Sequence, residues 1–200
     1  MIGLTGAHRA GKTTLAKLLA EKIGIPFLQL PPVVKQMGLS PKDIEHFGVR
    51  LEVQRAYLEE AAALYRTQPT IFITDRTPLD IAAYLLGDVR QDLPKHQIDD
   101  AMELLNQAVG LTSKTFSTIM FIPTVLKFEE HPDKPPMNPA YQNQIETLIK
   151  GLLYHDAMSC QFYLLGAQVT DLQDRLTVLM SLHERLCAAI ANAVVGMTRQ

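Results

Sequence analysis

The feature that most constrains this chain is a glycine-containing segment close to its start. Residues 6–14 read GAHRAGKTT, with a lysine and two threonines directly after the second glycine. A short apolar run at residues 2–5 precedes the segment, and leucines at helical spacing follow it. Because glycine adopts backbone angles closed to other residues, such a turn can bring successive backbone N–H groups close to an anion. The helix that follows adds the positive end of its dipole to the same site.

The spacing G-x-x-x-x-G-K-T between a strand and a helix is that of the P-loop, or Walker A motif, which binds nucleoside triphosphates. We therefore expect ATP to contact the whole loop, which consists of Gly6, Ala7, His8, Arg9, Ala10, Gly11, Lys12, Thr13 and Thr14. Lys12 is predicted to reach the β- and γ-phosphates, and the Thr13 hydroxyl to bind Mg²⁺. Arg9 either covers phosphate or points to solvent. His8 is interpreted as a loop side chain rather than a base.

The composition fits one globular domain spanning residues 1–200, with 47% apolar and 20% charged residues. A net charge of −2 gives no general basic field for nucleic acid and leaves only a local groove for DNA. Two cysteines are too few for a disulfide framework or a zinc cluster. No segment has the pattern of a signal peptide or the ~18 apolar residues of a membrane span. We therefore expect a cytoplasmic protein without membrane contact.

Strand-like and helix-like segments alternate along the chain. The expected strands are residues 2–5, 26–30, 70–74, 117–122 and 162–165. The expected helices are residues 12–23, 41–65, 79–86, 95–109 and 141–154, with a last helix after a cap at Asp171. This alternation predicts a doubly wound α/β fold, a parallel sheet with helices on both faces. Ligands bind such sheets at the carboxyl ends of the strands.

Asp75 and Arg76 follow the expected strand at residues 70–74, at the same edge of the sheet as the loop. Asp75 is predicted to ligate Mg²⁺ and to accept the proton of an attacking hydroxyl; its alternative role is to cap the next helix. Arg76 is predicted to clamp an anionic acceptor, with a solvated charge as the alternative. Asp80 either orients Arg76 or closes the first helical turn. The predicted catalytic residues are thus Lys12, Asp75 and Arg76.

Two stretches carry a resemblance to a known family, GAHRAGKTTLA at residues 6–16 and DRTPLDIAAY at residues 75–84. Weaker matches lie at residues 50–54 and 133–146. The chain resembles the P-loop kinases that phosphorylate nucleosides and nucleoside monophosphates, and more closely the small phage and bacterial members of AAA-type ATPase/kinase character. The resemblance implies a P-loop NTPase fold with a five-stranded parallel sheet in the order 2-3-1-4-5.

The resemblance also implies where the acceptor and the lid lie. The acceptor is expected beneath the helix at residues 43–66, with Arg50 and Gln54 turned toward it; an exposed polar face is the alternative for both. The loop at residues 125–139 occupies the place of the lid within the domain. Lids in such kinases usually carry arginine, and this one contains none. Lys134 is therefore the expected lid cation, although lysine lacks the guanidinium fork.

Together these features predict a Mg²⁺-dependent kinase that transfers the ATP γ-phosphate to a nucleotide-like acceptor, foremost a (deoxy)nucleoside monophosphate. Two alternatives stay open: a kinase acting on the hydroxymethyl group of a modified pyrimidine in phage DNA, and an ATPase or switch without an acceptor. The net charge does not indicate DNA binding. The resemblance places Arg175 where relatives contact the adenine-side loop after the fifth strand, but Arg175 is interpreted as a surface residue of the last helix. The leucines of residues 172–186 are interpreted as core, with a homodimer seam as the alternative.

Overall fold

The computed structural model describes residues 1–39, 43–68, 71–125 and 138–197. Its centre is a parallel sheet of five strands within these ranges, in the order β2-β3-β1-β4-β5. The strands are β1 (Ile2–Thr5), β2 (Phe27–Leu28), β3 (Ile73–Thr74), β4 (Thr118–Phe121) and β5 (Gln161–Leu164). The predicted fold class and strand order are therefore confirmed. The central strand is β1, and the loop that follows it leaves the middle of the sheet.

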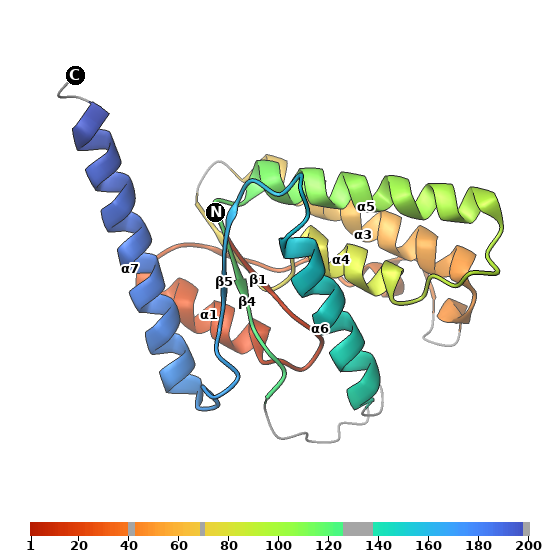
Figure 1. Ribbon diagram of the computed structural model, residues 1–200, viewed down its shortest axis with the longest axis horizontal. Helices are drawn as coiled ribbons and strands as arrows, with labels where there is room; N and C mark the ends of the chain where they lie inside the picture. The colour runs from red at the N-terminus through yellow and green to blue at the C-terminus, as the bar shows by residue number, and fades with distance from the viewer. Residues whose placement is uncertain (40–42, 69–70, 126–137, 198–200) are drawn as a thin grey trace.

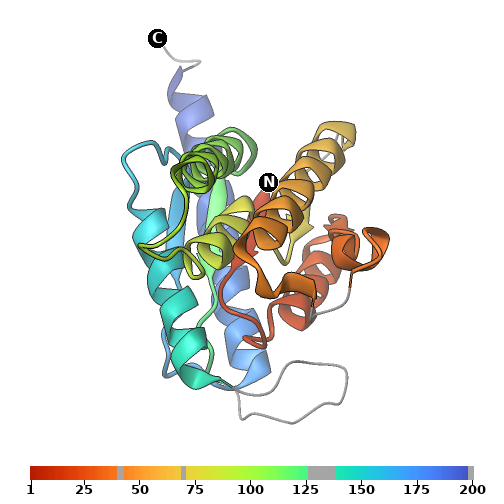
Figure 2. The ribbon, with the colours of Figure 1, turned by 90° about the vertical axis from the view of Figure 1, so that its right-hand side faces the viewer.

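Helices cover both faces of the sheet (Figures 1 and 2). They are α1 (Lys12–Ile23), α2 (Val33–Gln36), α3 (Phe47–Thr67), α4 (Pro78–Leu86), α5 (Lys95–Thr115), α6 (Pro139–Leu153) and α7 (Leu172–Met197), with a short 3₁₀ turn at Asp43–Glu45. One face packs against α1 and α7 through a cluster that includes Leu15, Leu19 and Leu176. The other face packs against α3 to α6. Alternate residues of β4 enter the two cores, because successive side chains of a strand point to opposite faces.

Helix α4 lies at the centre of the second layer and is buried on nearly all sides, from Pro78 to Leu85. It packs against α3, α5 and α6. Its start lies close to the sheet because β1 carries Gly3, where an added Cβ would lie 2.5 Å from the Thr77 methyl group. A helix buried in this way normally excludes charge, yet α4 contains Asp80, which is 1% exposed.

Several element boundaries differ from those expected. Strands β2 and β3 are only two residues long, and α5 continues to Thr115 rather than ending near residue 109. Helix α5 passes through Gly110, where a Cβ would meet nothing within 4 Å, and it ends at the buried Phe116. Helix α3 begins after His46; the helix start expected at residues 40–41 lies outside the described residues.

Helix α7 begins as predicted, with the Asp171 carboxylate accepting hydrogen bonds from the backbone N–H groups of Gln173 and Asp174 at 2.7 and 3.2 Å. Leu176 and Leu179 are each 1% exposed and pack against α1, so the core interpretation is correct for these two, but it is wrong for Leu172, which is 41% exposed in the first turn of α7. The C-terminal end of α7 extends beyond the sheet (Figures 1 and 2). None of the helices in the described ranges has the length and apolar character needed to cross a bilayer.

Candidate active site

The loop between β1 and α1 requires glycine at both of its glycine positions. Gly6 has φ 149°, and a Cβ there would lie 2.3 Å from the carbonyl oxygen of Ile122, which directly follows β4. Gly11 has φ 81° and caps α1. Arg9 also takes a left-handed conformation, φ 63°, which costs a non-glycine residue about 1 kcal/mol. Such strain persists only where surrounding contacts fix the backbone.

Lys12 folds back over the loop that precedes it. Its ammonium group donates hydrogen bonds to the carbonyl oxygens of Gly6 and Ala7 at 2.5 and 2.8 Å. The nearer Asp80 oxygen is 3.9 Å away. Burial lowers the pKa of Lys12, and the negative charge of Asp80 opposes that change. The lysine is therefore held at the mouth of the loop, where a phosphate oxygen can replace the carbonyls.

Thr13 and Asp75 meet at the carboxyl edge of the sheet. Thr13 lies in the first turn of α1 and Asp75 directly follows β3, and the threonine hydroxyl donates a hydrogen bond to the Asp75 carboxylate. Asp75 is 8% exposed. A hydroxyl and a carboxylate are the kind of oxygen donors that Mg²⁺ binds beside phosphates, so the residues present fit the metal that the sequence implies.

Asp80 has a larger structural role than the sequence indicated. One oxygen accepts hydrogen bonds from the Thr77 N–H, the Thr77 hydroxyl and the Thr5 hydroxyl, at 2.7, 2.9 and 2.9 Å. The other accepts from the Gly6 N–H at 3.1 Å. The Thr77–Asp80 pair is the capping box that the T-x-x-D spacing permits, so the closed first turn is confirmed. Its contacts with Thr5 and Gly6 tie α4 to the start of the loop.

The loop is also held from α4 and α6 through His8. The His8 backbone N–H donates to the Tyr84 hydroxyl at 2.8 Å, and the Gln142 side-chain amide donates to the His8 carbonyl at 3.2 Å. The His8 ring lies 6.4 Å from the Tyr84 ring and 6.2 Å from the Tyr141 ring, centre to centre. Burial lowers the pKa of His8, and the charges of Lys12 and Arg9 lower it further. The imidazole thus fits the predicted role of a packed loop side chain.

A cavity of about 550 Å³ opens beside the loop. Its described lining consists of Thr13, Gln29, Leu30, Pro31, Pro32, Tyr57, Asp75 and Arg76. The Arg76 guanidinium lies 5.1 Å from the centre of the Tyr57 ring, close enough for a cation–π contact. The volume suits a ligand of nucleoside size. The sequence did not predict residues 29–32 or Tyr57 as part of the site. The position of residues 29–32 directly after a strand, at the ligand-binding edge of the sheet, could have indicated them.

The structure brings together some of the predicted acceptor residues and not others. Arg76 lines the cavity with Thr13 and Asp75. Arg50 is absent from the described lining, and its guanidinium pairs instead with Asp88 at a distance of 2.6 Å. Gln54, half-buried on α3, is also absent from that lining. Lys134 and residues 126–137 of the lid-like loop lie outside the described residues.

The interpretation of Arg175 as a surface residue is wrong. Arg175 is 1% exposed, and its guanidinium donates hydrogen bonds to the carbonyl oxygens of Val169, Ala10 and Pro123 at 2.8, 2.9 and 3.1 Å. The physical reason is its register on α7, because Arg175 lies next to the buried Leu176 and four residues before the buried Leu179. A charged residue on the apolar face of a helix was the signal that could have revealed it.

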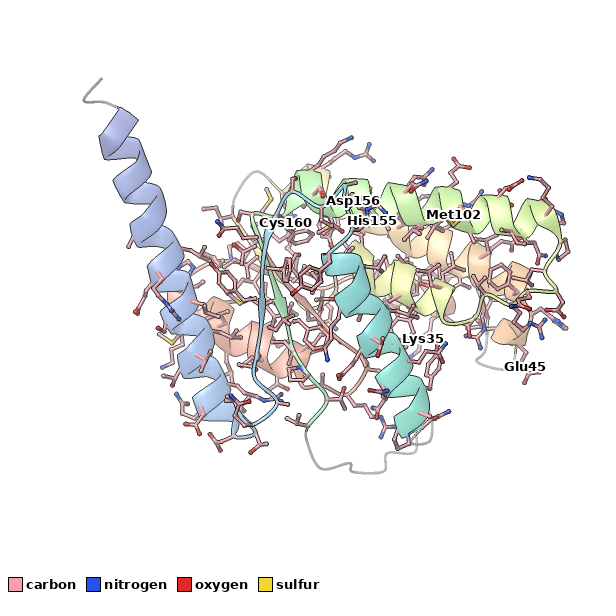
Figure 3. The ribbon with its side chains drawn as sticks, viewed as in Figure 1. Lys35, Glu45, Met102, His155, Asp156 and Cys160 are labelled. Atoms are coloured by element: carbon pink, nitrogen blue, oxygen red, sulfur yellow. The ribbon has the colours of Figure 1, made fainter. Side chains whose placement is uncertain are left out.

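A second group of titratable side chains, around Cys160, lies away from the carboxyl edge of the sheet. Cys160 directly precedes β5, at the amino edge of the sheet, with His155 and Asp156 nearby (Figure 3). Its thiol is free, and burial raises its pKa, which disfavours the reactive thiolate. The phosphate loop, the Thr13–Asp75 pair and the cavity all lie at the carboxyl edge instead.

The loop, the strand order and the carboxylate after β3 define a protein with the fold of the P-loop nucleotide kinases. The sequence matches the AAA domain family over residues 1–108 of the 200-residue chain, and the protein belongs to that family. A search of curated proteins found no significant match.

Solved structures with a similar fold include deoxyadenosine kinase from M. mycoides. With bound dCTP, that enzyme superimposes with a TM-score of 0.68 at 15% identity, covering 92% of this chain and 98% of the kinase. With bound dATP, the TM-score is 0.67 at 14% identity, with the same coverage. The YorR protein of Bacillus subtilis, in complex with phosphorylated GDP, gives a TM-score of 0.51 at 12% identity, covering 92% of this chain and 95% of YorR. At these identities the similarity concerns the fold.

Proposed function

We propose that this protein is a Mg²⁺-dependent kinase that transfers the γ-phosphate of ATP to a nucleoside-type acceptor, either a (deoxy)nucleoside or its monophosphate. The observation that carries the proposal is the position of Thr13 and Asp75. Both residues line the cavity, and Thr13 also belongs to the phosphate loop. A donor site and a nucleoside-sized cavity therefore share one wall, as a two-substrate phosphoryl transfer requires.

The donor half consists of the loop from Gly6 to Thr14. Its backbone N–H groups and the N-terminus of α1 bind the phosphates, and Lys12 exchanges its two carbonyl contacts for oxygens of the β- and γ-phosphates. Thr13 and Asp75 would hold Mg²⁺. When bound there, the ion neutralises phosphate charge and fixes the orientation of the γ-phosphate. These residues position the donor rather than react with it.

The acceptor half is the cavity. An acceptor oxygen attacks the γ-phosphorus, the bond from that phosphorus to the bridging oxygen breaks, and ADP leaves. For a hydroxyl acceptor, Asp75 is the only carboxylate among the described residues of the lining, so it is the group placed to take the proton. Arg76 neutralises charge on the transferring group or on the acceptor. Tyr57 and the two prolines, Pro31 and Pro32, provide flat apolar surface for a base.

The charges of the described lining bear on the acceptor. Arg76 is the only cation among those residues. A nucleoside presents a neutral hydroxyl and needs no further cation, whereas a monophosphate brings about two negative charges. The described lining therefore favours a nucleoside. The monophosphate acceptor requires a second cation, for which Lys134 of the proposed lid and Arg50 are the candidates.

Labelled ATP offered with Mg²⁺ to a panel of acceptors tests the proposal. The panel contains nucleosides, nucleoside monophosphates, hydroxymethylated DNA and no acceptor, each with wild-type protein and with Lys12→Met as the blank. Label in a nucleoside or monophosphate supports the proposal and chooses between the two. Label in DNA alone identifies the DNA kinase alternative. ATP hydrolysis that no acceptor accelerates identifies an ATPase or switch and contradicts the kinase proposal.

A further inference from the structure

Arg175 is the most deeply buried cation in the described part of the chain, and its environment is unusual for a charged group. The guanidinium makes no salt bridge to a described carboxylate; its three nitrogen donors bind three backbone carbonyls. Burying a cation without a counter-charge is unfavourable, and it is tolerated where hydrogen bonds fix the group. The simplest explanation is a purely structural role, in which Arg175 only anchors α7.

The identity of the three acceptors argues for a more specific role. Ala10 lies in the phosphate loop, Pro123 follows the end of β4, and Val169 lies in the loop between β5 and α7. These three segments are far apart in sequence, and all three leave the carboxyl edge of the sheet, where ligands of such folds bind. One planar guanidinium thus sets their mutual positions, which a lysine cannot do because its donors do not form a rigid fork.

The Ala10 contact is the important one for the donor site. Ala10 directly precedes Gly11, which caps α1 with φ 81°, and follows Arg9, which has φ 63°. A hydrogen bond to the Ala10 carbonyl therefore fixes the Ala10–Gly11 peptide, which leads into the left-handed Gly11. It also leaves a net positive charge one hydrogen bond away from the loop that receives the phosphates.

We propose that Arg175 is a positioning residue for the donor nucleotide: it holds the phosphate loop, the segment after β4 and the segment after β5 in the arrangement that binds ATP. The inference rests on the proposed donor role of the loop and adds a residue that neither the family match nor the Walker motif contains. Its effect falls on ATP and spares the acceptor, because none of its three partners lines the cavity.

The test measures the affinity for a non-hydrolysable ATP analogue with Mg²⁺ by calorimetry, and the KM values for ATP and acceptor where turnover is observed. The variants are Arg175→Met, which removes charge and donors, and Arg175→Lys, which keeps the charge. Arg185→Met removes an exposed arginine from the same helix, and Leu179→Ala weakens the packing of α7 while leaving all three hydrogen bonds of Arg175 in place. Melting temperatures are recorded for all four.

We expect Arg175→Met to weaken analogue binding about tenfold to a hundredfold, since a charged donor to a buried acceptor is lost. The analogue affinity of Arg175→Lys should lie between those of Arg175→Met and the wild type. The acceptor KM should stay within about twofold of the wild-type value. Leu179→Ala should lose melting temperature and retain analogue affinity within about twofold, and Arg185→Met should match the wild type.

Wild-type analogue affinity in a folded Arg175→Met protein overturns the inference and leaves the proposed function intact. If Arg175→Met does not fold, Arg175→Lys provides the test. Wild-type affinity in that variant overturns the proposal that the guanidinium holds the three loops in position. An equal loss of affinity in Leu179→Ala reduces Arg175 to an anchor of α7 and also overturns it. Failure of the wild-type protein to bind the analogue instead contradicts the proposed donor site itself.

Discussion

The phosphate loop and the cavity beside it meet at Thr13 and Asp75, but they are held in different ways. The loop is held through its backbone, which is hydrogen-bonded by side chains from three helices: Asp80 and Tyr84 of α4, Gln142 of α6 and Arg175 of α7. The cavity is lined by side chains from α1, from α3 and from the segments that follow β2 and β3, and the Thr13–Asp75 hydrogen bond and the Arg76–Tyr57 contact connect some of these side chains.

This difference indicates a division of tasks between the two regions. A loop fixed through its backbone presents N–H groups, and these recognise a phosphate chain whatever nucleotide carries it. A cavity lined by side chains can distinguish one acceptor from another, because its shape and polarity depend on residue identity. Substitutions near the loop should therefore affect donor affinity, turnover and stability, whereas substitutions in the cavity should affect acceptor selectivity.

The largest effect is expected for Lys12→Met. The ammonium group is the proposed cation of the β- and γ-phosphates, and removing one such group from a phosphoryl-transfer site costs about a hundredfold to a thousandfold in turnover. Steady-state kinetics with labelled ATP measures the loss. Lys17→Met, an exposed lysine on the same helix, is the matched control and should retain turnover. Equal activity in both variants would remove Lys12 from the donor site.

Asp75→Asn should lower turnover about a hundredfold while leaving the protein folded, because the amide is a poor ligand for Mg²⁺ and cannot accept a proton. The Mg²⁺ concentration that gives half-maximal turnover should rise. Kinetics across a magnesium titration, with melting temperature as the fold check, measures both. Near-wild-type turnover at low magnesium would contradict the assignment of Asp75.

For Asp80→Asn we expect the opposite result, a loss of stability, although Asp80 lies only five residues after Asp75. Asp80 accepts four hydrogen bonds in a buried setting, and an amide would turn its own N–H toward donors. We expect a loss of about 2 kcal/mol in the free energy of unfolding, measured by urea denaturation. Asp99→Asn on the exposed face of α5 is the control. A variant as stable as the wild type would show that Asp80 does not secure the loop to α4.

Tyr57→Ala tests the cavity side of the comparison. Loss of the ring removes the wall that contacts Arg76, and we expect the acceptor KM to rise about tenfold. Tyr57→Phe keeps the ring and should remain close to the wild type. The KM for ATP should be unchanged in both variants. A rise in the ATP KM equal to that of the acceptor would mean that the two regions are not independent.

The smallest effect concerns the pH dependence of stability. The pKa of His8 in the folded protein lies below its ordinary value of 6.5, with burial as the first cause. The unfolded chain therefore binds more protons around and below pH 6.5, and folding stability contributed by the neutral imidazole falls as the pH drops through that value. Melting temperatures from pH 8 to 5 should decline less in His8→Asn than in the wild type. Parallel profiles would contradict the burial of His8.

The parts of the site that the sequence predicted are those encoded by local spacing. The glycine loop, the cap of α7 at Asp171 and the carboxylate after β3 all follow from residues close together in the chain. The alternation of segments predicted the fold class, and the resemblance to P-loop kinases supplied the strand order. The exact ends of β2 and β3 could not be predicted, because each strand is only two residues long.

The supports of the loop could not be read from local spacing. Asp80 reaches Gly6 across 74 residues and Arg175 reaches Ala10 across 165. The helical register of Arg175 could have indicated that it is buried, but not what it binds, because its carbonyl acceptors are brought together only by the fold. The same holds for the pairing of Arg50 with Asp88, which its helical register did not reveal.

The position of the loop within the sheet order has a consequence for biosynthesis. Strand β1 hydrogen-bonds to β3 and β4, and the loop receives its last described contacts from residues 142 and 175. At about 5–20 residues per second, the ribosome adds residue 175 roughly ten to thirty seconds after it has passed the loop. If the loop binds ATP and Arg175 positions it, as proposed, we expect a nascent chain to have an incomplete phosphate site through most of its synthesis and to bind nucleotide tightly only after α7 has been added.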